Sequence, residues 1–173
     1  FVFSGIMYGK QKDYEAQLEK IGVDDKDGFT CTSYLRENGN TPKYKDVLAW
    51  SESSAVVFAN SVLGARCNRN SGILDTICSI LGVVPNFGFT TDEGRKATWK
   101  VIVKTTKKPE AQILGSAIGI KVQEEVPYVI GLDQYLDELP SEDTIAYLKD
   151  FGAATASNGA VGLYHIDKIT PEA

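Results

Sequence analysis

The chain has 173 residues, of which 43% are hydrophobic, so it is long enough for one ordinary domain with a sizeable core. Its net charge of −5 argues against nucleic-acid binding, because such proteins present a basic surface to phosphates. No run reaches the roughly 20 apolar residues of a membrane span. Three cysteines without close spacing favour a reducing compartment. We therefore expect a cytoplasmic protein without membrane or nucleic-acid partners.

The first part of the chain is predicted to be mainly helical. Apolar side chains at helical spacing predict a helix over residues 9–21, with Tyr14, Leu18 and Ile21 on one face. A wholly apolar run predicts a buried helix over residues 51–63, with Ser51 or Ser53 as its N-cap and Gly64 as its stop. A third helix is expected over residues 72–81, where one face holds Leu74, Ile77, Cys78 and Leu81 and makes Cys78 a packed thiol.

The second part alternates between strands and helices. The expected order is a strand over 97–105, a helix over 109–120 with Pro109 in its first turn, a strand over 127–132, a helix over 141–151 and a strand over 160–166. This alternation is typical of a parallel sheet, and apolar strands without strict alternation favour a sheet covered on both faces. We therefore predict an α/β fold: a helical, motif-bearing part over residues 1–95 and a layered α/β part with a mainly parallel sheet over 96–173.

Two arginines follow the buried helix and its glycine stop. Arg66 and Arg69 could grip a carboxylate or a phosphate, because a guanidinium presents a planar fork of donors to these anions. They could equally cap helix carbonyls or form surface ion pairs. Further along, Asp92, Glu93 and Arg95 form either a structural ion-pair cluster or part of a site. The residues alone leave these alternatives open.

The other candidates for chemistry are sparse. From the residues alone, Cys31 is better explained as an inert thiol than as a soft ligand for iron. His165 is the single histidine and lies in an apolar strand, so we expect it to be packed and hydrogen-bonded. Without a serine elbow it cannot form a Ser-His-Asp triad, and no glycine-rich phosphate loop is present. Gly115 and Gly119 are expected to permit close helix packing.

Four segments resemble the large component of the aconitase X family, iron-dependent dehydratases related to aconitase. They are the run from Asn60 to Arg66, Phe29 to Tyr34, Asp92 to Ala97, and Ile169 to Ala173. The resemblance extends from about Asp13 onward. It implies an aconitase-like fold and suggests that the chain is an interior portion of a longer protein.

The resemblance implies an iron-dependent hydro-lyase that dehydrates a small hydroxy acid. We expect cis-3-hydroxy-L-proline as the substrate, with mevalonate 5-phosphate as the alternative. Cys31 is the implied ligand of iron or an iron–sulfur cluster, with further ligands beyond Ala173. The substrate-binding residues implied are Glu52, Ser53, Asn60, Ser61, Arg66, Asn68 and Arg69. The catalytic base is expected outside this chain, on a small swivelling subunit or a fused domain.

Three positions depart from the family pattern. Cys67 stands where threonine is usual, which we interpret as a neutral replacement. Thr90 stands where histidine is common, and Ser33 replaces a proline. If the histidine contacts substrate, this protein handles a different substrate or the contact is dispensable. The remaining alternative is a non-catalytic α/β interaction domain that has lost its metal site.

Overall fold

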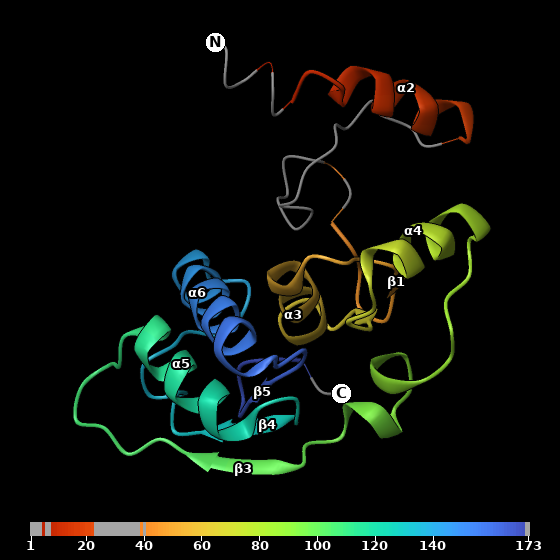
Figure 1. Cartoon of the computed structure of the whole chain (residues 1–173). Helices are drawn as coiled ribbons and strands as arrows, with labels where there is room; N and C mark the ends of the chain where they lie inside the picture. The colour runs from red at the N-terminus through yellow and green to blue at the C-terminus, as the bar shows by residue number, and fades with distance from the viewer. Residues whose placement is uncertain (1–4, 6–7, 23–38, 40, 172–173) are drawn as a thin grey trace.

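The structure is a computed structural model that describes residues 5, 8–22, 39 and 41–171 (Figure 1). The segment with Cys31 and Ser33 therefore lies outside the described residues. In this part of the chain the helices are α2 (Gln11–Lys20), α3 (Ser53–Ser61), α4 (Gly72–Leu81), α5 (Ala111–Val122) and α6 (Glu142–Gly159), with the short 3-10 helices η2 (Gly88–Thr90) and η3 (Glu93–Arg95). The strands are β1 (Val47–Leu48), β2 (Arg66–Cys67), β3 (Trp99–Ile102), β4 (Pro127–Ile130) and β5 (His165–Ile166).

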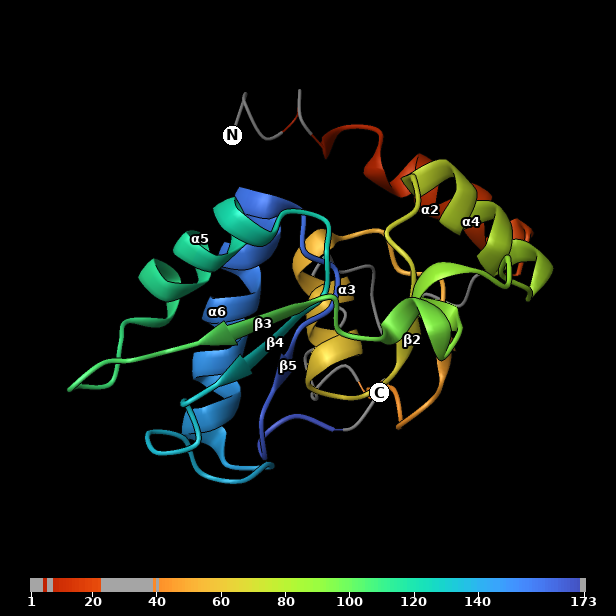
Figure 2. The same cartoon turned by 90° about the horizontal axis from the view of Figure 1, so that it is seen from below.

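Every strand pair that the structure describes is parallel, which confirms the predicted α/β class. β1 pairs with β2, and a separate sheet has the order β3-β4-β5. The helices α5 and α6 connect the three strands of the larger sheet and lie together on one of its faces (Figures 1 and 2). Within the described residues no helix lies on the other face (Figures 1 and 2), so the predicted cover of both faces stays a prediction.

The buried helix α3 lies at the centre of the molecule. Each residue from Ala55 to Ser61 is buried, because α3 packs against α6 on one side and β2 on another (Figure 1). Gly64 has a positive φ of 66°, but the predicted stop is wrong in position, because α3 already ends at Ser61 with Val62 as its C-cap. The predicted N-caps are wrong: Glu52 caps the helix, and its carboxylate accepts hydrogen bonds from the amides of Ser54 and Ala55. The division of the chain near residue 95 stays a prediction.

Glycines bring α5 and α6 into close contact. An added Cβ at Gly115 would lie 2.5 Å from the carbonyl oxygen of Phe151, and one at Gly119 would lie 2.7 Å from that of Thr155. The predicted role of these glycines is confirmed. α6 extends to Gly159, past its predicted end at Phe151, and the last strand is only His165–Ile166, shorter than the predicted 160–166. Pro109 lies outside α5, which begins at Ala111.

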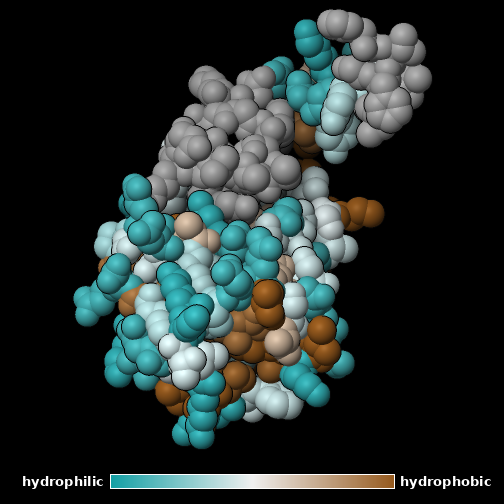
Figure 3. Space-filling view, turned by 90° about the vertical axis from the view of Figure 1, so that its left-hand side faces the viewer, coloured by the Kyte–Doolittle hydropathy of each residue, from teal (hydrophilic) through white to brown (hydrophobic). Residues whose placement is uncertain are grey.

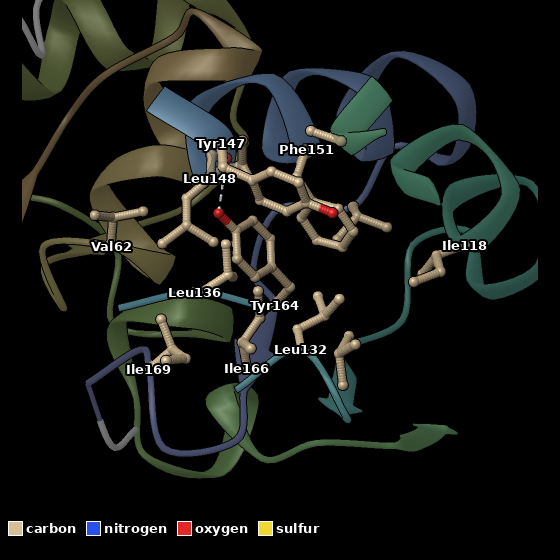
Figure 4. Close-up of a cluster of buried hydrophobic side chains, with 14 of the residues drawn as sticks. Val62, Ile118, Leu132, Leu136, Tyr147, Leu148, Phe151, Tyr164, Ile166 and Ile169 are labelled. Carbon is tan, nitrogen blue, oxygen red and sulfur yellow. Dashed lines mark hydrogen bonds between the residues drawn. The ribbon is translucent and has the colours of Figure 1, made fainter. Parts of the chain in front are cut away.

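The core lies between the three-stranded sheet and its two covering helices (Figure 4). The rings of Phe151 and Tyr164 meet edge to face with centroids 4.9 Å apart. The buried Tyr164 hydroxyl donates to the Leu148 carbonyl at 2.9 Å, which satisfies the polar end of that ring. Together these contacts join α6 to the segment that enters β5.

The apolar faces of α2 and α4 are largely exposed, although Cys78 on α4 is buried as predicted. On α4, Asp75 and Cys78 point inward, whereas Ile77 is 47% exposed and Leu81 is exposed as well. The reason is local: Asp75 accepts a hydrogen bond from the Asn70 amide at 2.9 Å, so the polar side of α4 packs on the preceding segment. α2 has no buried residue. None of the described helices is long and apolar enough to cross a membrane.

Candidate functional site

The side chain of Asn60 links three segments beneath the motif. It lies on α3 and is buried. Its Nδ2 donates to the carbonyl oxygens of Cys67 at 2.7 Å and Gly162 at 2.9 Å, and its Oδ1 accepts from the Cys67 amide at 2.9 Å. All of the hydrogen-bonding groups of this amide are therefore engaged within the protein.

Arg95 enters the same network from η3 and is only 2% exposed. Its guanidinium donates to Asn60 Oδ1 at 3.2 Å, to the Asn60 carbonyl at 3.0 Å and to the Ala65 carbonyl at 3.0 Å. Burial, together with the charge of Arg66, lowers the pKa of Arg95 to about 10. Within the described part of the chain no carboxylate lies within ion-pair distance of Arg95, so main-chain and amide oxygens hold this buried cation.

Asp92 and Glu93 do not form an ion-pair cluster with Arg95. Asp92 pairs instead with Arg66, whose other terminal nitrogen donates to the Thr90 carbonyl at 2.9 Å. The hydrogen bond and charge of Arg66 lower the pKa of Asp92. Glu93 pairs with the exposed Lys96. Arg66 is thus oriented by the loop that contains Thr90, the position at which the family pattern differs.

The second arginine of the motif contacts a different element. Arg69 donates to the carbonyl of Ala160, the C-cap of α6, and lines a surface pocket of about 350 Å3. Asn68 forms the base of this region: its Nδ2 donates to the Phe87 carbonyl at 2.9 Å and its Oδ1 accepts from the Phe89 amide at 2.7 Å. Because the guanidiniums of Arg66 and Arg69 contact separate segments, the structure does not join them into one clamp.

The remaining predicted site residues flank α3. Ser61 is buried and accepts from the Tyr164 amide at 3.0 Å. At the other end, the hydroxyl of Ser53 lies 3.5 Å from Glu52 Oε1. Burial alone would raise the pKa of Glu52, but hydrogen bonds from Ser54 and Ala55 outweigh it, and the pKa lies below its usual value. Both carboxylate oxygens of Glu52 serve as the helix cap.

The described residues contain no cluster of three side chains suited to hold a metal ion. Burial raises the pKa of the Cys67 thiol to about 11, so it remains protonated at neutral pH, and it lies 3.3 Å from the Trp50 amide nitrogen. Cys78 is buried too. The implied iron ligand, Cys31, lies outside the described residues, so the site described here supplies no ligand set.

His165 is packed and hydrogen-bonded, as predicted. Its Nε2 lies 2.9 Å from the Arg95 carbonyl oxygen. A carbonyl can only accept, so Nε2 carries the proton in this contact. Burial lowers the pKa of His165, which favours the neutral ring.

Comparison with known proteins decides the family. Residues 3–93 match the aconitase X first domain, and residues 97–173 match the aconitase X second domain. The chain belongs to the aconitase X family. It aligns with the solved holo-form of Thermococcus kodakaraensis aconitase X with a TM-score of 0.73 and 40% identity, over 92% of this chain and 40% of that one.

The curated aconitase X relatives carry two names. The phosphomevalonate dehydratase large subunit of Thermococcus kodakarensis is 41% identical over 95% of this chain and 42% of its own length. The cis-3-hydroxy-L-proline dehydratase of Pseudomonas aeruginosa is 34% identical over 84% of this chain and 24% of its own length. The chain therefore spans less than half the length of either relative.

Sequence reasoning missed the position of Arg95 in the site. Its sequence neighbours are charged or glycine, a pattern typical of an exposed turn. The segments that receive its hydrogen bonds, around Asn60 and Ala65, lie about 30 residues earlier in the chain. No local signal predicts that contact, whereas the buried character of α3 was evident from its apolar run.

Proposed function

We propose that the longer protein to which this stretch corresponds is a hydro-lyase that dehydrates a small hydroxy acid. The observation that carries the proposal is the 41% identity, over 95% of this chain, to a phosphomevalonate dehydratase large subunit. The name of that relative also supports a small partner subunit. The iron or iron–sulfur cluster that the family implies would depend on Cys31 and on ligands outside this chain.

We place mevalonate 5-phosphate first among the substrates. This order reverses the expectation of cis-3-hydroxy-L-proline, because the relatives named for that substrate are less similar, at 34% and 35% identity. The separate contacts of Arg66 and Arg69 favour the same choice. Mevalonate 5-phosphate has a carboxylate at one end and a phosphate at the other, whereas hydroxyproline has one anionic group.

In this proposal Arg66 binds the carboxylate and Arg69 the phosphate. The exposed carboxylate of Asp92 holds the Arg66 guanidinium in position, and a substrate anion joins or replaces it. Removal of the acidic proton next to the carboxylate places negative charge on that group, and a fixed guanidinium stabilises this charge.

The buried residues of the predicted site are proposed to position it. Asn60, Ser61 and Asn68 have their polar groups engaged by main-chain partners, so they hold the β2 segment and the 87–95 loop in place. Glu52 and Ser53 order the start of α3. The base that removes the proton is expected outside this chain.

The test is an anaerobic dehydratase assay on the full-length large subunit with its small partner, reconstituted with iron and sulfide. Mevalonate 5-phosphate and cis-3-hydroxy-L-proline are supplied separately. We expect the unsubstituted protein to turn over mevalonate 5-phosphate. Cys31→Ser should lose both iron and activity. Arg66→Lys should keep its iron content, but its kcat/KM should decrease by roughly 100-fold. The exposed Lys96→Ala is the matched control and should retain activity.

The other outcomes distinguish the alternatives. Turnover of cis-3-hydroxy-L-proline alone would reverse the proposed order of the two candidate substrates. Bound iron without turnover of either compound would indicate another hydroxy acid. A protein that binds no iron would support the non-catalytic interaction domain.

A further inference from the structure

Arg95 is a buried cation whose guanidinium donates to neutral oxygens. It is 2% exposed, and its partners are the side-chain oxygen of Asn60 and the main-chain oxygens of Asn60, Ala65 and Phe89. No carboxylate of the described residues forms an ion pair with it. A neutral amide can donate hydrogen bonds of this kind without the cost of burying a charge. The hydrogen bonds therefore explain a donor at this position, but they do not explain its charge.

Arg66 lies next to this buried charge. The carbonyl oxygens of Phe89 and Thr90 are consecutive in the chain, and each contacts one of the two arginines. The Phe89 oxygen lies 3.5 Å from an Arg95 nitrogen, and the Thr90 oxygen accepts from Arg66 at 2.9 Å. Burial, followed by the repulsion from Arg66, lowers the pKa of Arg95 to about 10, so Arg95 still carries its charge at neutral pH. Two cations are thus held against one turn.

The negative charge near these two cations lies at the surface. Asp92 pairs with Arg66, but its side chain is 84% exposed, so water weakens its effect on the buried side. The groups beneath are neutral at neutral pH. Burial raises the pKa of the Cys67 thiol to about 11 and lowers the pKa of His165, whose Nε2 contacts the Arg95 carbonyl. Positive charge is therefore in excess on the buried side of the turn.

We propose that Arg95 is a positioning residue of the anion site: without touching substrate, its buried charge strengthens the binding of the substrate carboxylate to Arg66. This inference rests on the proposed function, in which Arg66 is the residue that binds the carboxylate. A charge in the protein interior acts more strongly than one in water, and salt screens it little. A carboxylate that reaches Arg66 is therefore attracted by both arginines. The same field stabilises the negative charge that develops when the neighbouring proton is removed.

The test reads the electrostatic potential beside Arg66 from the pKa of a thiol. Asp92→Cys places this thiol where the native carboxylate pairs with Arg66, in the full-length large subunit with its small partner. The pKa follows from the rate of iodoacetamide labelling at different pH values, with the labelled peptide quantified by mass spectrometry. We expect a pKa below the ordinary thiol value of about 8.5. Adding Arg95→Gln should lower the thiolate fraction at pH 7 by at least roughly threefold, whereas adding Arg95→Lys, which keeps a charge, should lower it less.

A thiol on another side of the molecule is the matched control. Asp150→Cys replaces an exposed residue of α6 that lies beside Gln112 of α5. These two helices lie on the side away from α4 (Figure 1), and Figure 3 shows that side as hydrophilic surface around an apolar patch. The thiolate fraction at residue 150 should be unchanged by Arg95→Gln. Equal changes at residues 92 and 150 would contradict a local effect of the charge.

Enzyme kinetics separate this inference from the proposed function. In Arg95→Gln we expect KM for mevalonate 5-phosphate to rise roughly tenfold with a smaller change in kcat, and Arg95→Lys should restore most of the loss. If the unsubstituted enzyme turns over neither candidate substrate, the proposed function fails. The thiol at residue 92 still decides the role of Arg95, because its pKa does not depend on turnover.

Three results would overturn the inference. An unchanged thiolate fraction in Arg95→Gln would show that the buried charge does not reach the site, and equal decreases in Arg95→Gln and Arg95→Lys would assign the effect to lost hydrogen bonds. If Arg95→Gln does not fold, Arg66→Gln takes its place, which leaves Arg95 as the buried cation. High salt screens the exposed Lys45, which also acts on residue 92. A pKa still below about 8.5 there would support the inference, and an ordinary pKa would contradict it.

Discussion

Arg95 and Asn60 are joined at two points: one guanidinium nitrogen donates to the side-chain oxygen of Asn60, and the other donates to its main-chain oxygen. This pair ties the short helix η3 to the buried helix α3. It also brings Arg66, which follows α3 in the chain, beside Asp92, which precedes η3. The geometry of the proposed substrate site therefore depends on a residue pair that does not itself face a substrate.

Replacing Arg95 should destabilise the protein strongly. In Arg95→Met the oxygens of Asn60 and Ala65 lose their donors while they remain buried, which costs about 3 kcal/mol. Urea unfolding followed by tryptophan fluorescence measures the change. Lys96→Ala, next in the chain but exposed, should change the stability by less than about 0.5 kcal/mol. Equal effects of the two variants would contradict the role of Arg95.

The contact between α5 and α6 should tolerate no added methyl group. In Gly119→Ala the new Cβ would lie 2.7 Å from the Thr155 carbonyl oxygen, so the helices must separate, at a cost of about 2–3 kcal/mol. The control is Gly82→Ala, where φ is +67° but no atom lies within 4 Å. It should cost only about 1 kcal/mol from backbone strain. A melting experiment that ranks the two variants the other way would reject close packing as the cause.

Cys67 should give the stability a pH dependence in the alkaline range. Its folded pKa of about 11 lies above the ordinary value of 9.0, so the folded state holds the proton more tightly than the unfolded state. Stability from this group is fully present below pH 9 and is lost as the pH rises toward 11, by about 2–3 kcal/mol. Urea midpoints of the metal-free protein at pH 8, 9, 10 and 11 measure the loss.

The variant Cys67→Ser isolates this effect. All other ionisable groups are the same in both proteins, so the difference between the two curves reports the thiol alone. We expect the variant to lack the additional decline above pH 9. Parallel curves would show that Cys67 ionises at its ordinary pKa.

Asp92 should affect substrate binding through Arg66. In Asp92→Asn the charge that orients the guanidinium is removed, so we expect KM for mevalonate 5-phosphate to rise about tenfold with a smaller effect on kcat. The pKa of Asp92 is already lowered, so its ionisation should leave no step in the activity profile above pH 5. Glu93→Gln, whose carboxylate pairs with Lys96, should have unchanged kinetics. A larger KM in Glu93→Gln would place the anion site elsewhere.

We expect Glu52 to behave as the N-cap of α3, and we expect neither Ser51 nor Ser53 to do so. Glu52→Ala removes two acceptors from the first turn and should cost about 1–2 kcal/mol, whereas Ser51→Ala should be nearly neutral. The folded pKa of Glu52 is lowered, so its contribution is present above the unfolded pKa and is lost as the pH falls through the acid range. Circular dichroism during urea unfolding at pH 7 and pH 4 tests both statements.

The elements that follow a local rule were predictable from the sequence. The apolar run of α3 predicts a buried helix wherever it packs, and the glycine soon after it, Gly64, has a positive φ. Alternating strands and helices predict parallel pairing, because a crossover helix returns the chain in the same direction. Gly115 and Gly119 are one helical turn apart, so they indicate a close helix contact before the partner is known.

What the sequence could not determine depends on which side-chain contacts form in the folded chain. Helical spacing groups Leu74, Ile77 and Leu81 on one face of α4, but only the packing of Asp75 against Asn70 decides that this face is outside. Arg95 carries the composition of an exposed turn and is nonetheless buried, because α3 offers it carbonyl and amide oxygens from another part of the chain. Periodicity specifies which side chains share a face. Tertiary packing alone decides which of those faces is covered.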